Sequence, residues 1–88
     1  MRALVYYGNK DVRLESNWKD PKLLDDKDAI IKVSYTSICA TDIEEWQFGP
    51  NYIQPEDTPV VHGHEITGEV IEIGKNSTSL KVGDKVAV

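Results

Sequence analysis

Residues 29–42 read AIIKVSYTSICATD and contain the clearest change of pattern in the chain. In the first part of this stretch, Ile31, Val33 and Tyr35 alternate with a second set of residues that includes Lys32 and Ser34. A period of two is typical of a strand with one buried face. We therefore predict a half-buried strand over residues 29–36, which leads the chain directly to Cys39.

A short helix is predicted to begin at Thr41. Thr41 and Glu44 have the Ser/Thr-x-x-Glu spacing of a capping box, and Ile43 and Trp46 lie three positions apart, as neighbours on one helix face do. Cys39 then lies just before the N-terminus of this helix. The positive end of the helix dipole favours a thiolate at that position.

The rest of the chain reads as short strands joined by turns and loops. Glycine and asparagine tolerate the positive φ of a tight hairpin turn, and glycine inside a strand marks a bulge or a close backbone approach. The expected elements are strands over 3–7 and 11–15 around a turn at Gly8-Asn9-Lys10, exposed connections over 16–28 and 48–59, an extended segment over 60–73 interrupted at Gly63 and Gly68, turns at 74–77 and 82–84, and a last strand over 85–88. This pattern predicts a mainly β fold class, a small barrel or sandwich with one short helix after the Cys39 strand.

Length and composition limit the classes of function. A chain of 88 residues forms at most one domain. Ten basic against fifteen acidic side chains give a net charge of -5, which argues against a nucleic-acid partner. No apolar run approaches the roughly 20 residues of a membrane helix, so no membrane partner is expected. The presence of only one cysteine indicates a reducing compartment, and we expect a cytoplasmic protein.

Cys39, His64 and the two carboxylates Asp42 and Glu65 form the candidate metal site. A thiolate, an imidazole and carboxylates can hold a zinc ion with an open coordination position, as a catalytic zinc requires. Taken alone, Cys39 reads as a small buried apolar residue, and His64 as the partner of a backbone group. Their occurrence together, beside irregular backbone and next to carboxylates, favours the metal site. For His62 we expect a structural role.

Three motifs resemble the N-terminal catalytic half of the zinc-dependent medium-chain alcohol dehydrogenases. They are Cys39-x-x-Asp42, then Gly63-His64-Glu65-x-x-Gly68-x-Val70, and Gly83-Asp84-Lys85-Val86. The resemblance extends over nearly the whole chain. It implies a GroES-like barrel for residues 1–88, followed in the family by the remainder of the catalytic domain and a Rossmann domain that binds NAD or NADP. Because the chain stops at Val88 within an apolar run, we expect it to be the front part of a longer protein.

The resemblance also implies roles for individual residues. Cys39 and His64 correspond to zinc ligands, Glu65 to the adjacent carboxylate that can approach the metal, and Asp42 to the carboxylate that orients the His64 imidazole. A third protein ligand is expected beyond Val88. Thr41 occupies the position of the hydroxyl that binds the substrate alcohol and starts its proton relay, so it has two competing interpretations, relay and helix cap.

Departures from the family pattern concern the substrate and the proton path. Glu44 stands where many members have the histidine that passes the proton to solvent, which makes Glu44 the candidate catalytic residue at the end of the relay. Glu44-Glu45-Trp46 followed by Gly49-Pro50 is most similar to the polyol and butanediol dehydrogenase branch. The presence of a second, structural zinc is left open.

The resulting expectation is a fragment of a zinc-dependent oxidoreductase. The whole enzyme would move a hydride between a secondary alcohol or polyol and NAD or NADP, would act as a homo-oligomer, and would depend on Zn²⁺. The fragment alone is expected to be inactive. Two alternatives are a stand-alone co-chaperonin-like barrel, which shares the fold, and a zinc-free quinone reductase relative, which would be expected to lack Cys39 and His64.

Overall fold

The computed structural model describes residues 1–77 and 79–88. These residues form two compact units, one made of Met1–Lys19 and Ile38–His64, the other of Asp20–Ser37 and Glu65–Val88. Each unit contains one three-stranded sheet, and the first also contains α1 (Ala40–Phe48). The predicted fold class, mainly β with one short helix after the Cys39 strand, is confirmed.

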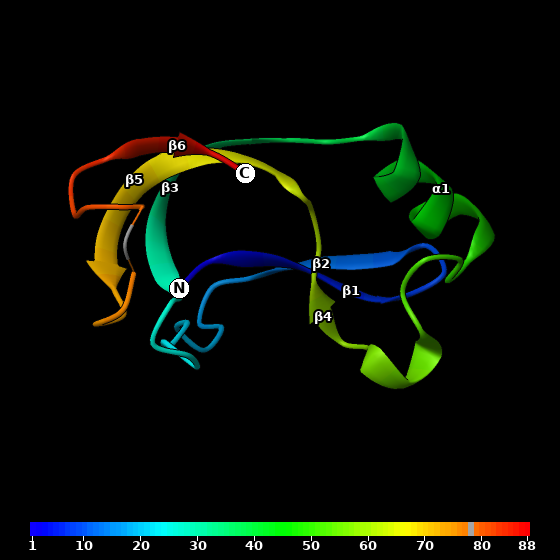
Figure 1. The fold of residues 1–88 in the computed structure, drawn as a ribbon. Helices are drawn as coiled ribbons and strands as arrows, with labels where there is room; N and C mark the ends of the chain where they lie inside the picture. Colours follow the sequence, from blue (N-terminus) through cyan, green and yellow to red (C-terminus); the bar gives the residue numbers. More distant parts are fainter. Residues whose placement is uncertain (78) are drawn as a thin grey trace. The chain divides into compact units, whose positions relative to one another are not determined.

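The sheet of the first unit is antiparallel, with the order β2-β1-β4 (Figure 1). Its strands are β1 (Ala3–Gly8), β2 (Asp11–Glu15) and β4 (Val60–Val61). The predicted hairpin joins β1 to β2, but the residues with positive φ are Gly8 at 150° and Lys10 at 57°, not Asn9. The chain after β4 continues the pairing, because the backbone N–H of His62 donates to the Leu4 carbonyl at 2.8 Å.

The core of the first unit lies between β1 and α1. Val5 and Tyr6 are fully buried. The hydroxyl of Tyr6 donates a hydrogen bond to the backbone carbonyl of Glu45 at 2.9 Å, and the backbone N–H of Lys10 donates to the carbonyl of Trp46 at 2.7 Å. Strand β1 and its hairpin turn therefore hold the C-terminal half of α1 in place.

The start of α1 corrects the prediction of a Thr41 cap. The N-cap residue is Cys39, and the helix begins at Ala40, so Thr41 already lies inside its first turn. The reason is Asp42, whose carboxylate accepts a hydrogen bond from the Cys39 backbone N–H at 2.9 Å. A carboxylate three residues after the N-cap satisfies a donor that the helix itself cannot satisfy.

The segment predicted as an irregular loop over 48–59 is partly helical. Phe48 is the last residue of α1, and Pro55–Asp57 forms a single 3₁₀ turn, η1. Proline near the start of such a turn needs no backbone N–H, which explains why a proline-rich segment can still contain it. Residues 49–54 follow the irregular course that the sequence predicts.

The sheet of the second unit is antiparallel, with the order β3-β5-β6. Its strands are β3 (Ala29–Ser37), β5 (Glu65–Ile73) and β6 (Lys85–Ala87). The predicted half-buried face of β3 is wrong for its second half, since Val33 is 54% and Tyr35 79% exposed. Every residue of β3 from Lys32 to Ser37 is exposed, so neither face of this half of the strand is buried within the described residues. The pairing register with β5 also shifts between Val33 and Tyr35.

Both glycines predicted to interrupt the extended segment over 60–73 have a structural reason. Gly63 has a φ of 106° and lies in the break between β4 and β5. A Cβ on Gly68 would lie 2.3 Å from the backbone oxygen of Lys32 on β3, which confirms the predicted close backbone approach. The first glycine thus sets the direction of the chain at His64, and the second allows β5 to pair with β3.

Candidate active site

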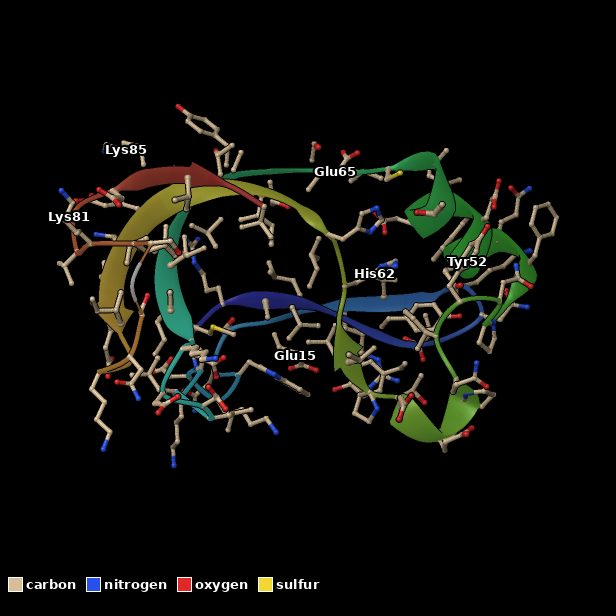
Figure 2. All side chains as sticks on the ribbon, in the orientation of Figure 1. Glu15, Tyr52, His62, Glu65, Lys81 and Lys85 are labelled. Carbon is tan, nitrogen blue, oxygen red and sulfur yellow. The ribbon has the colours of Figure 1, made fainter. Side chains whose placement is uncertain are left out.

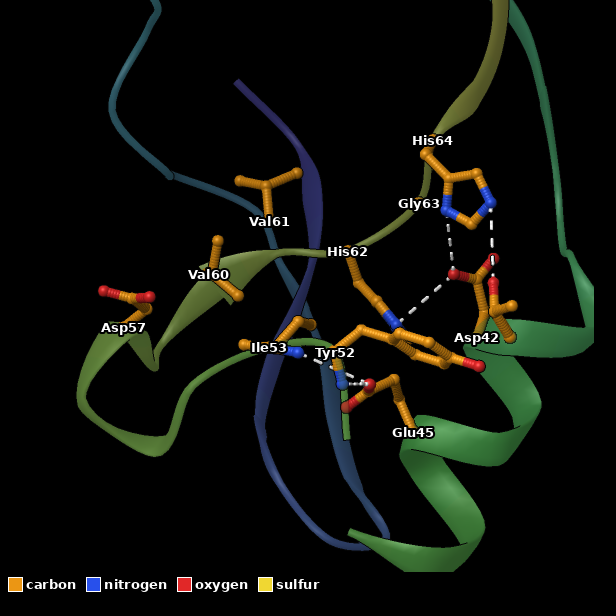
Figure 3. Close-up of a pocket in the computed structure, with 11 residues that line it drawn as sticks. Asp42, Glu45, Tyr52, Ile53, Asp57, Val60, Val61, His62, Gly63 and His64 are labelled. Carbon is orange, nitrogen blue, oxygen red and sulfur yellow. Dashed lines mark hydrogen bonds and ion pairs between the residues drawn. The ribbon is translucent and has the colours of Figure 1, made fainter. Parts of the chain in front are cut away.

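A pocket of about 550 Å³ lies within the first unit (Figure 3). It is bounded by the first turns of α1, by the segment that follows the helix, and by β4 with the residues after it. The lining residues are Thr41, Asp42, Glu45, Tyr52, Ile53, Asp57, Val60, Val61, His62, Gly63 and His64. Three of the sequence-predicted site residues, Thr41, Asp42 and His64, are therefore brought together here.

Asp42 is the centre of the polar side of this pocket. It is only 8% exposed, and its Oδ2 accepts the Cys39 backbone N–H described above. Its Oδ1 lies 3.4 Å from Nδ1 of His64 and 3.5 Å from Nε2 of His62. One buried carboxylate thus both caps the helix and faces two imidazoles, as the dashed lines in Figure 3 show for the imidazoles.

The orientation of His64 matters for its chemistry. Because Nδ1 faces a carboxylate, the tautomer with its hydrogen on Nδ1 is favoured, and Nε2 then carries the lone pair that a metal ligand needs. Thr41 Oγ1 lies 3.5 Å from this Nε2. The Thr41 hydroxyl is therefore next to the nitrogen that would bind a metal.

Cys39 and His64 lie close enough to share one metal ion. The Cys39 sulfur and a ring nitrogen of His64 are within 4.8 Å of each other. Glu65 is the covalent neighbour of His64 and opens β5, where its carboxylate accepts a hydrogen bond from the Ser37 hydroxyl at 2.5 Å. A thiolate and an imidazole held by a carboxylate are donors that zinc prefers, so the residues present fit this metal.

His62 packs inside the first unit, between Tyr6 and Asp42. Its ring is mostly buried, with its centroid 5.2 Å from that of Tyr6. Its Nε2 is fully buried and makes no hydrogen bond within the described residues, although Asp42 lies 3.5 Å away. The structural role expected of His62 stays a prediction.

The two adjacent glutamates of α1 have opposite environments. Glu44, predicted as the end of the proton relay, is exposed and does not line the pocket. Glu45 is only 2% exposed and does line it, a position that sequence reasoning missed. The available signal was its spacing, because Glu45 follows Asp42 by three residues and therefore shares its helix face.

The charge of Glu45 also affects its neighbour Tyr6. Burial raises the pKa of the Tyr6 phenol, and the negative charge of Glu45 raises this pKa further. A phenol is protonated at neutral pH even at its ordinary pKa of about 10, and the raised pKa keeps the hydrogen bond to the Glu45 carbonyl intact to higher pH. The link between β1 and α1 is thus maintained under physiological conditions.

No helix among residues 1–77 and 79–88 combines the length and apolar character that a membrane crossing requires.

Comparison with known proteins gives one consistent family. The family described as alcohol dehydrogenase GroES-like domain matches residues 25–88. A probable (R)-acetoin-forming diacetyl reductase of Saccharomyces cerevisiae is 37% identical over 100% of this chain and 23% of the relative. The crystal structure of 2R,3R-butanediol dehydrogenase from Bacillus subtilis superposes with a TM-score of 0.88 at 37% identity, over 99% of this chain and 27% of that one.

A zinc-dependent alcohol dehydrogenase from Streptococcus pneumonia has a TM-score of 0.87 at 27% identity, over 100% of this chain and 24% of that one. The chain therefore spans about a quarter of the length of the proteins it matches. The expected GroES-like fold is confirmed by these matches. The chain belongs to the alcohol dehydrogenase GroES-like domain family.

Proposed function

We propose that residues 1–88 are the N-terminal part of the catalytic domain of a zinc-dependent dehydrogenase, called the parent protein below. Its reaction is the transfer of a hydride between a secondary alcohol or polyol and NAD or NADP. The observation that carries this proposal is the position of His64, whose Nδ1 faces Asp42 and whose Nε2 lies beside Thr41, while one of its ring nitrogens lies within 4.8 Å of the Cys39 sulfur. Relatives named as butanediol dehydrogenase and zinc-dependent alcohol dehydrogenase support it.

Cys39 and His64 are the residues of this chain that would hold the zinc, with Glu65 as the adjacent carboxylate. When bound, zinc supplies a Lewis acid for the substrate oxygen. A third protein ligand and the nicotinamide site belong to the part of the parent protein outside residues 1–88. The isolated 88-residue chain is therefore inactive as an oxidoreductase.

The residues of the chain have distinct tasks in this reaction. Asp42 fixes the ring of His64 and keeps the hydrogen on Nδ1, so that the tautomer does not change during turnover. Thr41 accepts the hydrogen of the substrate hydroxyl and passes its own hydrogen on toward solvent. Glu44, exposed on the outside of α1, is the solvent-side acceptor of this relay. Apolar side chains on the opposite side of the pocket, from Ile53 and Val60, exclude water from the carbon skeleton of the substrate.

The parent protein is a homo-oligomer of the cytoplasm in this proposal. A cysteine that serves as a metal ligand must remain a thiolate, which a reducing compartment favours. Neither alternative needs the observed site. A co-chaperonin-like barrel has no use for a thiol and an imidazole within 4.8 Å of each other, and a zinc-free reductase has no use for the Asp42 contact that orients His64.

The proposal is tested on the purified parent protein. Reduction of NAD⁺ and NADP⁺ is followed with butane-2,3-diol, sorbitol and ethanol at equal concentration, and zinc content is measured on the same samples. We expect a preference for the diol or polyol, and we expect Cys39→Ser to lose both the catalytic zinc and turnover. Ile38→Val, a change at the exposed neighbouring residue, is the control and should retain both. Turnover and zinc retained in Cys39→Ser would refute the proposed site.

A further inference from the structure

Glu45 has an environment that the proposed reaction does not explain. Its carboxylate is buried inside the first unit, and burial of an isolated carboxylate is unfavourable unless hydrogen-bond donors surround it. Its neighbour Glu44 is exposed. A rotation of α1 that exposed Glu45 would therefore bury a different face of the helix. A buried carboxylate at the edge of a pocket requires a specific partner.

That partner is the backbone of residues 51–53. The N–H of Asn51 donates to both carboxylate oxygens of Glu45, at 3.1 Å and 3.0 Å. The N–H groups of Tyr52 and Ile53 donate to Oε1, the latter at 3.4 Å. Three successive backbone N–H groups thus converge on one carboxylate, in the manner of an anion-binding nest. Figure 3 shows the bonds from Tyr52 and Ile53. Hydrogen bonds to an ionised acceptor are about twice as strong as those between neutral groups.

Within residues 1–77 and 79–88, the hydrogen bonds that tie residues 51–53 to the rest of the unit are those to Glu45. Asn51 is exposed and Tyr52 is 66% exposed, although Tyr52 and Ile53 line the pocket. A loop with few buried apolar contacts opens readily unless polar bonds retain it. Figure 2 shows Tyr52 beside α1, the helix that carries Glu45. The carboxylate therefore supplies the main attachment between the helix and this wall of the pocket.

The attachment point is itself fixed. The Tyr6 hydroxyl donates to the Glu45 carbonyl at 2.9 Å, which ties this turn of α1 to the buried strand β1. The same helix carries Thr41 and Asp42 in its first turn. Glu45 thus sets the distance between the polar side of the pocket, which holds the reacting groups, and the wall formed by Tyr52 and Ile53.

We propose that Glu45 is a positioning residue that holds residues 51–53 as the substrate-facing wall of the pocket, through hydrogen bonds from three successive backbone N–H groups to its carboxylate. The substrate part of this inference rests on the proposed function: with the wall fixed, the pocket binds a small secondary alcohol or diol tightly, and with the wall loose the same substrate binds weakly. Thr41 and Asp42 keep their positions because they lie one turn earlier on α1, and Cys39 and His64 lie outside this helix. Glu44 stays on the exposed face of the helix.

The test combines hydrogen exchange with kinetics on the parent protein. Glu45→Gln removes the charge and places amide hydrogens against the N–H of Asn51, and Glu44→Gln makes the same change at the exposed neighbour as a control for exchange. Amide exchange in a peptide covering residues 51–53 should become about 10- to 100-fold faster in Glu45→Gln, as expected for the loss of charge-assisted bonds. Exchange in the β1–β2 hairpin should stay within about twofold of wild type, because β1 keeps its own core.

Steady-state kinetics distinguishes a positioning role from a purely structural one, because only the positioning role changes KM for the substrate. We expect KM for butane-2,3-diol to rise about tenfold in Glu45→Gln while kcat and zinc content change less than about twofold, the pattern of lost ground-state binding. Glu45→Asp keeps the charge but is one methylene shorter, so it should restore part of the exchange protection and part of the affinity.

The outcomes separate the two proposals. Unchanged exchange at residues 51–53 in Glu45→Gln overturns the inference, and so does faster exchange at these residues with an unchanged KM. If Glu45→Gln unfolds as a whole, the exchange of Glu45→Asp is measured instead. Faster exchange that is uniform over Glu45→Asp, with no larger increase at residues 51–53, counts against the inference. If the wild-type parent protein oxidises no alcohol but exchange still rises at 51–53, the proposed function fails while the attachment by Glu45 stands.

Discussion

Replacement of Asp42 by asparagine is the perturbation whose effect the structure specifies best. The amide keeps the size of the side chain and can still accept the Cys39 N–H, but it loses the negative charge. That charge lies in the first turn of α1 and faces two imidazole nitrogens, at 3.4 Å and 3.5 Å. Loss of the favourable interaction with the helix dipole costs about 0.3–1 kcal/mol. Weakening of the charge-assisted bond to Cys39 brings the expected loss of unfolding free energy to about 1–2 kcal/mol.

Metal affinity should respond more strongly than stability. Without the carboxylate, the ring of His64 loses the partner that fixes its tautomer, and such a loss lowers metal affinity by about 10- to 100-fold. Urea denaturation of Asp42→Asn and zinc competition with a chelator measure the two effects on the parent protein. Asp57→Asn is the matched control, since Asp57 lines the same pocket but is exposed. If Asp42→Asn loses no more stability and no more zinc affinity than Asp57→Asn, the role assigned to Asp42 is wrong.

Three further predictions concern other parts of the chain. Gly68→Ala should destabilise the protein by about 1–3 kcal/mol in urea, because the new Cβ would overlap the Lys32 carbonyl; an unchanged midpoint would contradict the β3–β5 approach. Burial raises the pKa of Tyr6, and the hydrogen bond to Glu15 raises that of Tyr7. The folded state therefore holds these protons more tightly than the unfolded state. Stability should fall as pH rises above about 10, and Tyr6→Phe or Tyr7→Phe should flatten this dependence in denaturation at pH values of about 9 and 11. Glu44→Gln should lower turnover about 10- to 1000-fold with zinc retained if Glu44 ends the relay, whereas an unchanged rate would assign it to the solvated helix surface.

The features predicted correctly from the sequence are those decided by nearby residues. The hairpin follows from Gly8 and its neighbours, the break between β4 and β5 from Gly63, and the position of Cys39 from the strand before it and the helix after it. The close approach at Gly68 was predictable because a glycine inside a strand usually marks a bulge or a backbone contact. In each case the deciding signal lies within a few positions along the chain.

The features that sequence reasoning missed depend on contacts that the pattern does not reveal. The helix starts at Ala40 because of the Asp42 bond to Cys39, which competes with the equally plausible Thr41 capping box. Glu45 reads as one more surface glutamate until the backbone of residues 51–53 folds back onto it. Tyr35 is exposed because neither face of the second half of β3 is covered within the described residues, which the alternation of residues along β3 does not reveal.

The most direct test of the proposed zinc site is the location of zinc in crystals of the parent protein by anomalous scattering at the zinc absorption edge. We predict a zinc peak bonded to the Cys39 sulfur at about 2.3 Å and to Nε2 of His64 at about 2.0–2.1 Å. We also predict that Nδ1 of the same ring faces Asp42 and that the Thr41 hydroxyl borders the open coordination position. A zinc-loaded crystal with no peak within bonding distance of Cys39 and His64 would contradict the proposed site.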